Sequence, residues 1–355
     1  MKYNFNAGPS HLNEEILERI SNSIKNFENS GLSIIELSHR SKEFESVIEE
    51  CKVLLSELLG LDSDSEVFFM QGGASFQFYT LPFNFLRTND CVYYANTGRW
   101  AEKAIVEAKR FAKVKLAGSS KSDNYSRIPE LEITNENARY LHITSNNTIY
   151  GTEYSGIPDC QIPIVADMSS DIMGRKFDYN AFDLIYAGAQ KNLGTAGVAV
   201  VIAKKHFIQE AKEGLPPMLS YKNMIANNSL FNTPPVLAIY IVLETLRWSI
   251  RYGGIERIDK TNRAKAKLLY NTIDESNLYY GTARKEDRSL MNVCFKLKDK
   301  SLENKFIDFT NSHGIIGIKG HRSFGGFRAS LYNCIPLEYV KVLTDVMKEF
   351  ERKYG

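Results

Sequence analysis

The chain is poor in cysteine and carries no paired-cysteine motif. Its 355 residues include five cysteines, an odd number, and no two of them stand in a CxxC arrangement. This pattern argues against a disulfide framework and against a zinc site, so we expect reduced thiols and no bound metal. The five are Cys51, Cys91, Cys160, Cys294 and Cys334.

A strong charge of one sign and a long apolar run are lacking too. The formal net charge is +2, which gives no electrostatic reason to expect nucleic acid or an anionic membrane as a partner. The longest apolar run, residues 236–243, is too short to cross a bilayer, and the N-terminus shows no signal-peptide core. Apolar residues make up 43% of the chain, which excludes disorder, and we expect a cytoplasmic globular protein.

Apolar periodicity predicts alternating strands and helices from residue 66 onward. This alternation favours an α/β fold with a mostly parallel sheet between helices. Pro234-Pro235 opens a long helix that ends at Gly253-Gly254, and we place a domain boundary there. The predicted units are an N-terminal arm (1–12), a large domain (13–254) and a smaller C-terminal α+β domain (255–355). Other helices are expected at 12–27, 44–59, 74–86, 98–111, 255–275 and from 336, and strands at 66–70, 91–95, 139–144, 161–166, 183–187, 197–203, 290–297, 315–318 and 326–331.

One lysine stands between two buried strands. Lys191 lies in a glycine-rich turn, with the apolar runs 183–187 before it and 197–203 after it. Desolvation in such a turn lowers the pKa of an amine and makes it a nucleophile that can form a Schiff base with a carbonyl. The alternative is a lysine that extends from a strand end into solvent, and Lys191 alone does not decide between the two.

Asp167 favours the Schiff-base interpretation. It ends a core strand 24 residues before Lys191. A carboxylate at a strand end can pair with the protonated pyridine nitrogen of pyridoxal phosphate (PLP), while the lysine holds the aldehyde. The alternative for Asp167 is a helix N-cap for the segment that follows it.

The segment Gln71-Gly-Gly-Ala-Ser75 supplies the third part that a PLP site needs. It lies between a predicted strand and a predicted helix, so its backbone N–H groups and the positive helix end would face an anion. The spacing does not match the GxGxxG or GxxxxGK[ST] motifs of nucleotide sites. We therefore interpret the turn as a cradle for the cofactor phosphate.

Several strings resemble the phosphoserine aminotransferases, a family of fold-type I PLP enzymes. The resemblance covers nearly the whole chain, and several strings are specific to that family rather than to the fold. They are Phe5-Asn-Ala-Gly-Pro9, Ser38-His-Arg40, Gly188-Ala-Gln-Lys191-Asn, Phe231-Asn-Thr-Pro-Pro235, Lys319-Gly-His-Arg322 and Phe327-Arg-Ala-Ser330.

The resemblance implies a role for each matching cofactor residue. Lys191 is similar to the Schiff-base lysine that carries a proton between substrate and cofactor, and Asp167 to the partner of the pyridine nitrogen. Trp100 resembles the aromatic residue that stacks on the ring, and Thr148 a side chain that hydrogen-bonds its polar edge. Phosphate contacts are implied for Ala74, Ser75 and Gln190, and for Asn232 and Thr233 from the other subunit of an obligate homodimer.

The implied substrates are glutamate and 3-phosphooxypyruvate, which place a carboxylate or a phosphate at about the same distance from the reacting carbon. Cations that tolerate both anion geometries suit such a pocket. In the family, His39-Arg40 and His321-Arg322 converge on this distal anion, the second pair coming from the partner subunit, and Arg328 resembles the clamp on the α-carboxylate. Taken singly, either His-Arg pair could be a solvated turn.

This chain departs from some family members at two positions. Some members have arginine where this chain has Ser75 and serine where it has Ala7, which leaves those two contacts open. Some relatives also make 4-phosphohydroxy-L-threonine for pyridoxine synthesis, and the sequence leaves that role open.

Two other functions compete with phosphoserine transamination. One keeps the PLP fold but assigns alanine or serine:glyoxylate transamination, or cysteine desulfurase chemistry with Cys334 as the nucleophile. The two His-Arg pairs argue against it. The other makes the glycine turn a nucleotide-binding module without catalysis, and it leaves Lys191 and Asp167 unexplained.

Overall fold

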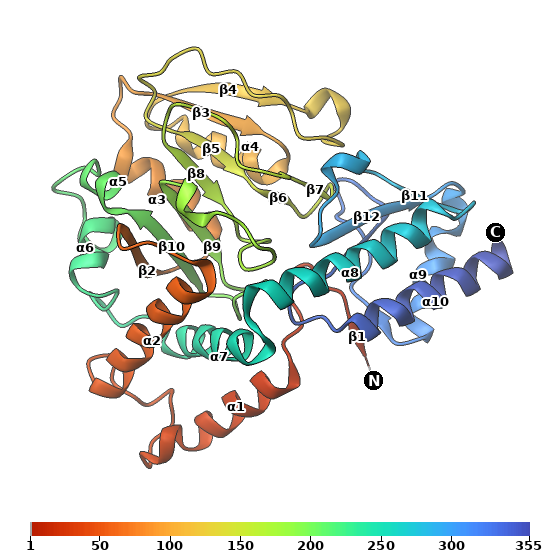
Figure 1. Cartoon of the computed structure of the whole chain (residues 1–355), viewed down its shortest axis with the longest axis horizontal. Helices are drawn as coiled ribbons and strands as arrows, with labels where there is room; N and C mark the ends of the chain where they lie inside the picture. The colour runs from red at the N-terminus through yellow and green to blue at the C-terminus, as the bar shows by residue number, and fades with distance from the viewer. Residues whose placement is uncertain (1) are drawn as a thin grey trace.

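A mixed sheet forms the centre of the larger lobe in the computed structural model, which describes residues 2–355. Its seven strands lie in the order β2-β10-β9-β8-β5-β3-β4, and within it only β10 runs antiparallel to its neighbours (Figure 1). The mostly parallel mixed sheet of the prediction is confirmed. The strands are β2 (Ser65–Gln71), β3 (Cys91–Asn96), β4 (Lys113–Ser119), β5 (Leu141–Thr144), β8 (Ile164–Asp167), β9 (Leu184–Gly188) and β10 (Val198–Lys204).

Helices cover both faces of this sheet, which explains why its strands read as continuous apolar runs. On β2, Val67 and Phe69 join the core under α2 (Lys42–Leu59) and α7 (Val236–Tyr252). Phe68 and Met70 face the opposite core, under α3 (Ala74–Phe85), α5 (Lys205–Gln209) and α6 (Tyr221–Ala226). Because successive side chains alternate between faces, both sides of the strand must be apolar.

Local sequence signals set the helix ends. The Ser41 side chain accepts a hydrogen bond from the Phe44 amide at the start of α2, and Gly60, with φ 62°, ends it in the left-handed conformation. Helix α7 follows Pro235 and ends at Gly253, as the sequence predicted. Helices α1 (Glu14–Lys25) and α4 (Arg99–Ala108) also lie inside their expected ranges.

The smaller lobe packs its own sheet against helices at the other end of the molecule (Figure 1). Its three-stranded sheet has the order β11-β12-β14, all antiparallel. The N-terminal arm adds to this lobe, because β1 (Tyr3–Asn4) pairs with β13 and Phe5 is buried in its core. The elements are α8 (Gly254–Asp274), β11 (Tyr279–Gly281), β12 (Asn292–Leu297), α9 (Glu303–Ser312), β13 (Ile315–Ile316), β14 (Phe327–Ser330) and α10 (Leu337–Tyr354).

Five strands (β1, β4, β6, β7 and β11) and three helices (α5, α6 and α9) of the fold had no counterpart in the prediction. Strand β4 lies at the sheet edge, and its alternating lysines hide it from a search for apolar runs. Strands β6 (Asn146–Asn147) and β7 (Thr152–Glu153) form a short polar hairpin, and α9 buries only Phe306 and Thr310.

Candidate active site

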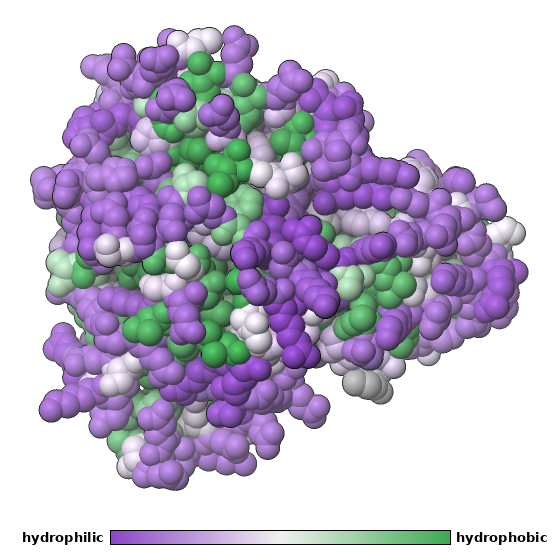
Figure 2. Space-filling view, in the orientation of Figure 1, coloured by the Kyte–Doolittle hydropathy of each residue, from purple (hydrophilic) through white to green (hydrophobic). Residues whose placement is uncertain are grey.

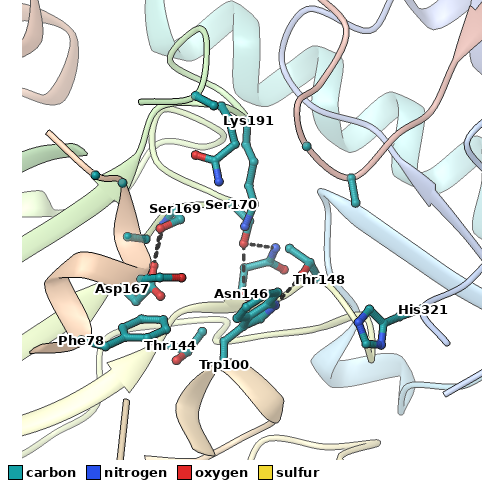
Figure 3. Close-up of a pocket in the computed structure, with 18 of the residues that line it drawn as sticks. Phe78, Trp100, Thr144, Asn146, Thr148, Asp167, Ser169, Ser170, Lys191 and His321 are labelled. Atoms are coloured by element: carbon teal, nitrogen blue, oxygen red, sulfur yellow. Dashed lines mark hydrogen bonds between the residues drawn. The ribbon is translucent and has the colours of Figure 1, made fainter. Parts of the chain in front are cut away.

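A cavity of about 390 Å³ opens where the parallel strands of the large lobe end (Figure 3). The carboxyl ends of β2, β5, β8 and β9 meet there, which is where open α/β sheets bind ligands. It is lined by Ala7, Gly8, Gly72, Gly73, Ala74, Ser75, Phe78, Trp100, Thr144, Asn146, Thr148, Asp167, Ser169, Ser170, Gln190, Lys191, Ala196, Gly197, His321 and Arg328.

Lys191 extends into this cavity from the turn after β9 (Figure 3). Burial lowers the pKa of its amine to about 8, although the negative charge of Asp167 opposes the shift. The N-terminal arm packs against its backbone: the Ser10 hydroxyl donates to the Lys191 carbonyl at 2.5 Å. A Cβ atom at Gly8 would lie 3.3 Å from Lys191 Cγ, so glycine allows this approach. The lysine lines a cavity rather than extending from a strand end into solvent.

Asp167 lies buried at the end of β8 and is held by Ser169. Its Oδ1 accepts hydrogen bonds from the Ser169 amide at 3.0 Å and the Ser169 hydroxyl at 2.5 Å. Both bonds use the same oxygen, which leaves Oδ2 for a ligand. Burial raises the pKa of Asp167, and the Lys191 charge and the Ser169 bonds oppose the rise. The residues after Asp167 form turns rather than a helix, so Asp167 is not a helix N-cap.

An anion cradle lies at the start of α3. Gly72 and Gly73 take φ values of 99° and 70°, which L side chains rarely adopt, and they turn the chain from β2 into the helix. A Cβ atom at Gly188 would lie 3.2 Å from the Ala74 nitrogen and 2.7 Å from Gln190 Oε1. The first amides of α3 have no partner within the helix and line the cavity with Ser75.

Trp100 and Thr148 form a second wall. The Trp100 Nε1–H donates to the Thr148 hydroxyl at 3.0 Å, and the Thr148 carbonyl accepts from Arg328 Nη1 at 2.9 Å. Arg328 Nε is buried and has no hydrogen-bond partner among residues 2–355. Arg328 thus carries its positive charge into the cavity wall with one donor, Nε, that the protein leaves without an acceptor.

The structure gathers nine of the predicted site residues around the cavity and leaves five outside. Inside are Ala74, Ser75, Trp100, Thr148, Asp167, Gln190, Lys191, His321 and Arg328. The residues that do not line it are His39, Arg40, Asn232, Thr233 and Arg322. The two positions where the chain departs from some relatives, Ala7 and Ser75, both face the cavity.

His321 lines the cavity of its own chain, and the expectation that the His321-Arg322 pair serves the partner's site stays a prediction. The loop between Lys319 and Phe327, which form a bridge, folds back toward the large lobe. There Phe324 packs edge-on against Tyr150, with ring centroids 5.0 Å apart. This contact places His321 at the mouth, while Arg322 is exposed.

The sequence did not single out several cavity residues. Ser169 and Ser170 stand two and three residues after Asp167, so an aspartate at a strand end with two hydroxyl residues close behind it was a usable signal. Asn146 belongs to the polar run Ser145-Asn-Asn-Thr148, which resembles an ordinary loop. Thr144 and Phe78 carry no such signal, because they follow the patterns of a buried strand and a buried helix.

A search of the described residues for metal and membrane features, and the state of Cys334, give three further observations. Residues 2–355 contain no cluster of His, Cys, Asp and Glu suited to a metal ion. In the same range no helix is both long and apolar enough to cross a membrane. Cys334 is buried, and burial raises the pKa of its thiol to about 11, which disfavours a nucleophilic cysteine at this position.

Several known proteins are similar to this chain in both sequence and fold. A family model described as "Aminotransferase class-V" matches residues 2–343. A phosphoserine aminotransferase of Azobacteroides pseudotrichonymphae is 49% identical and one of Bacillus subtilis strain 168 is 47% identical, each over 99% of this chain and 98% of the relative. The solved phosphoserine aminotransferase of Bacillus circulans subsp. alkalophilus has a TM-score of 0.97 at 44% identity, covering 100% of this chain and 99% of that one.

These findings identify the class of protein first: the chain is a PLP-dependent aminotransferase of fold type I. A PLP-bound phosphoserine aminotransferase from Trichomonas vaginalis has a TM-score of 0.93 at 36% identity, covering 98% of this chain and all of that one. The chain belongs to the phosphoserine aminotransferase family. Its own residues fit the cofactor, since the glycine cradle, the free Oδ2 of Asp167 and the Lys191 amine face one cavity.

Proposed function

We propose that this enzyme transfers the amino group between L-glutamate and 3-phosphooxypyruvate, giving 2-oxoglutarate and O-phospho-L-serine in serine biosynthesis. The observation that supports it most is a set of cations near His321 that form no ion pair with a carboxylate. Arg328, Arg99, Arg322 and Lys103 all lie near His321 and, after burial, lower its pKa. A site of this charge suits substrates with an anion at each end.

The acids near these cations are already paired. Glu102 on α4 accepts from Lys121 at 2.8 Å, and Glu107 pairs with Arg110 at 2.8 Å. Among the described residues, none of the four cations around His321 forms an ion pair with a carboxylate, although the Arg99 charge acts on Glu102. Clustered like charges repel one another, and a dianionic substrate would remove that cost.

The cofactor residues have separate tasks. PLP supplies an electron sink that acidifies the Cα–H bond of an amino acid. Asp167 would hold the ring nitrogen through Oδ2, while Ser169 keeps Oδ1 engaged. The glycine cradle with Ala74 and Ser75 would hold the phosphate, and Trp100 would cover the ring and exclude water.

Lys191 would move the reacting proton. Among the described residues that line the cavity, it supplies the only amine. With a pKa of about 8 it can be neutral at physiological pH, take a proton from the substrate Cα, and return it at the other end of the reaction. Arg328, which lines the cavity, would hold the α-carboxylate.

A second copy of the chain would complete the site. His39, Arg40, Asn232 and Thr233 carry the expected anion contacts but do not line their own cavity. Exposed apolar side chains accompany them in sequence: Leu32 is 49% exposed, Ile35 58% and Phe231 38%. The hydrophilic surface of the large lobe is likewise interrupted by apolar patches (Figure 2). We infer a homodimer in which these four residues face the partner's cavity.

A paired assay tests the reaction. Glutamate-dependent amino transfer is measured with 3-phosphooxypyruvate and with plain pyruvate and glyoxylate as acceptors. We expect kcat/KM for the phosphorylated acceptor to exceed the others by roughly two decades or more, since each lost charge-assisted contact costs about 1.5 to 3 kcal/mol. Equal or better use of glyoxylate would replace this function with alanine or serine:glyoxylate transamination.

A further inference from the structure

The hairpin of residues 146–153, formed by β6 and β7, is part of the cavity wall and is also where the small lobe docks. Its first half carries Asn146 and Thr148, which line the cavity. Its second half ends at Glu153, which is 3% exposed. The hairpin therefore connects the cofactor side of the site with the small lobe.

The small lobe binds this hairpin through the segment just before β12. The Ser289 amide donates to the Gly151 carbonyl at 2.9 Å, and the Ser289 hydroxyl donates to Asn146 Oδ1 at 2.5 Å. The Leu290 amide donates to Glu153 Oε2 at 2.7 Å. These three bonds fix the start of β12 on the large lobe.

Strand β12 pairs with β14, the strand that carries Arg328. In the antiparallel pair of β12 and β14, Cys294 stands opposite Arg328. The position of Arg328 over the cavity therefore depends on where β12 begins, at Asn292, two residues before Cys294.

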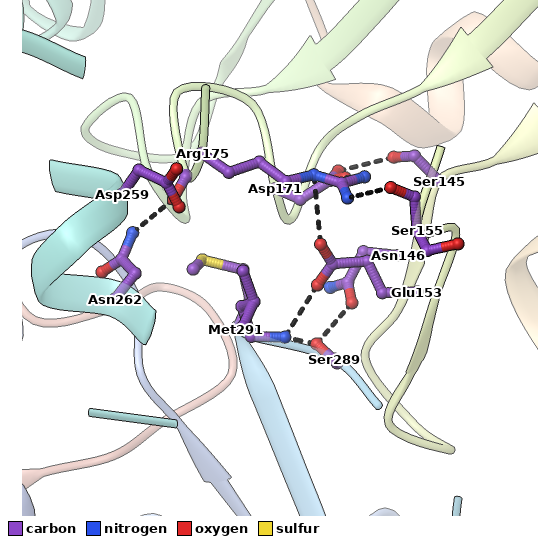
Figure 4. Close-up of polar contacts among 12 residues, drawn as sticks. Ser145, Asn146, Glu153, Ser155, Asp171, Arg175, Asp259, Asn262, Ser289 and Met291 are labelled. Atoms are coloured by element: carbon purple, nitrogen blue, oxygen red, sulfur yellow. Dashed lines mark hydrogen bonds and ion pairs between the residues drawn. The ribbon is translucent and has the colours of Figure 1, made fainter. Parts of the chain in front are cut away.

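A buried arginine fastens the other side of the hairpin to the loop after Asp167 (Figure 4). Arg175 Nε lies 3.2 Å from Glu153 Oε1, and Arg175 Nη2 lies 3.8 Å from Asp171 Oδ2. Asp171 Oδ1 accepts from the Ser145 hydroxyl at 2.5 Å, and this hydroxyl also lies 3.0 Å from the Asp167 carbonyl. The three charged side chains are no more than 8% exposed.

Stability alone gives little reason for such a cluster. Removing charges from water costs several kcal/mol per ion, and apolar replacements of buried ion pairs are often neutral or stabilising. The geometry offers another reason. Glu153 is a carboxylate with two acceptor oxygens, one bound to the large lobe through Arg175 and the other to the small lobe through Leu290.

We propose that Glu153 and Arg175 are positioning residues for the substrate carboxylate: they set the place of the strand pair that carries Arg328 relative to Asp167 and Lys191. This inference rests on the proposed role of Arg328 as the carboxylate clamp. The pair acts through Arg328 and does not touch the substrate.

The test variant is Glu153→Gln. An amide has one acceptor oxygen, so glutamine can satisfy Arg175 or the Leu290 amide but not both. We expect the KM for glutamate and for the keto acid to rise together, roughly 5- to 30-fold, while kcat stays within about threefold, because the clamp holds the ground state and the transition state alike. Hydrogen exchange at the Leu290 amide, measured on the apoprotein, should become faster.

Glu244→Gln is the matched control. Glu244 is a carboxylate of 1% exposure that accepts from Arg247 Nη1 at 2.7 Å on α7, and it does not line the cavity. We expect it to lower the thermal midpoint as Glu153→Gln does, with unchanged KM values and unchanged exchange at Leu290. If both variants lose stability and neither alters KM or Leu290 exchange, Glu153 is a structural residue only and the inference is wrong.

Arg328→Ala separates this inference from the proposed function. If Arg328→Ala leaves the KM for glutamate unchanged, Arg328 is not the carboxylate clamp, and the role proposed for it in holding the α-carboxylate is wrong. Faster Leu290 exchange in Glu153→Gln would then still support the anchoring of β12, and unchanged exchange would refute it. Because Arg175→Met could prevent folding by leaving two buried carboxylates, Glu153→Gln is the decisive variant.

Discussion

A dimer made of two different variant chains can show whether Arg40 acts in the cavity of its own subunit or in that of its partner. Arg40 is exposed and does not line its own cavity, and the neighbouring His39 Nε2 is buried without a partner among the described residues. If Arg40 contacts the distal anion in the partner's cavity, Arg40→Ala should cost one charge-assisted contact, about 1.5 to 3 kcal/mol. At about 1.4 kcal/mol per decade, the KM for 3-phosphooxypyruvate should rise roughly 10- to 150-fold in the homodimeric variant.

The dimer formed from one Arg40→Ala chain and one Lys191→Ala chain gives the sharper result. In the proposed arrangement, the cavity of the Arg40→Ala chain holds an intact Lys191 and receives Arg40 from the other chain. The second cavity carries both defects. The mixed dimer should therefore show wild-type KM at about half the wild-type activity per dimer.

Arg328→Ala supplies the control for this experiment. Arg328 lines the cavity of its own chain, so a mixed dimer of Arg328→Ala and Lys191→Ala has one defect in each cavity. It should show no wild-type component. If the Arg40→Ala mixture also lacks a wild-type component, Arg40 serves its own cavity and the proposed exchange between subunits is wrong.

Three further outcomes are expected. Lys191→Ala should keep its far-UV circular dichroism but lose transamination, because no other described residue of the cavity supplies an amine; steady-state turnover without added amines would remove Lys191 from the mechanism. Asp167→Asn should lower kcat/KM by roughly two to four decades, because a lost buried charge partner costs about 3 to 5 kcal/mol. Activity within threefold of wild type would show that another group holds the ring nitrogen. Burial raises the pKa of Glu153 above its ordinary value of 4.5, with the Asp171 charge adding to the rise and the Arg175 charge opposing it. Its contribution to stability is therefore complete below pH 4.5 and is lost as the pH rises through the pKa of the folded state. Glu153→Gln should flatten the fall of the thermal midpoint over that range, and an unchanged slope would assign the pH dependence elsewhere.

The buried strands were predictable because burial on both faces leaves a simple signal. Strands β2, β3, β9 and β10 begin and end within one residue of their predicted ranges, since each is a short apolar run. Strand β4 was missed for the opposite reason: it lies at the sheet edge, and Lys113 and Lys115 alternate with its apolar residues. The polar hairpin of residues 146–153 was missed because its stability comes from partners such as Ser289 and Arg175, which are distant in sequence.

The cofactor residues were predictable for a different reason, since their types and order match a known chemistry. Asp167, Lys191 and the glycine turn stand at strand ends, and parallel strands bring such ends to one edge of the sheet. The residues that orient them were not predictable in this way. Ser169 acts on Asp167 through two hydrogen bonds to one oxygen, and no periodicity in the sequence marks which oxygen stays free.

The sequence alone does not decide which subunit supplies the cations that contact the distal anion, because this depends on their placement in three dimensions. His39-Arg40 and His321-Arg322 have the same two residue types, and nothing in composition or spacing tells which pair lies near Lys191. The fold separates them physically: the packing of Phe324 on Tyr150 and the bond from Arg328 to Thr148 bring His321 to the cavity of its own chain, whereas His39 and Arg40 precede α2 and do not reach it. If His39 and Arg40 face the partner's cavity, as proposed, a distal anion would lie between His321 of one subunit and His39-Arg40 of the other. In that arrangement the Glu153-Arg175 pair, by holding the strands that carry Arg328, would also set how far the substrate extends toward the partner subunit.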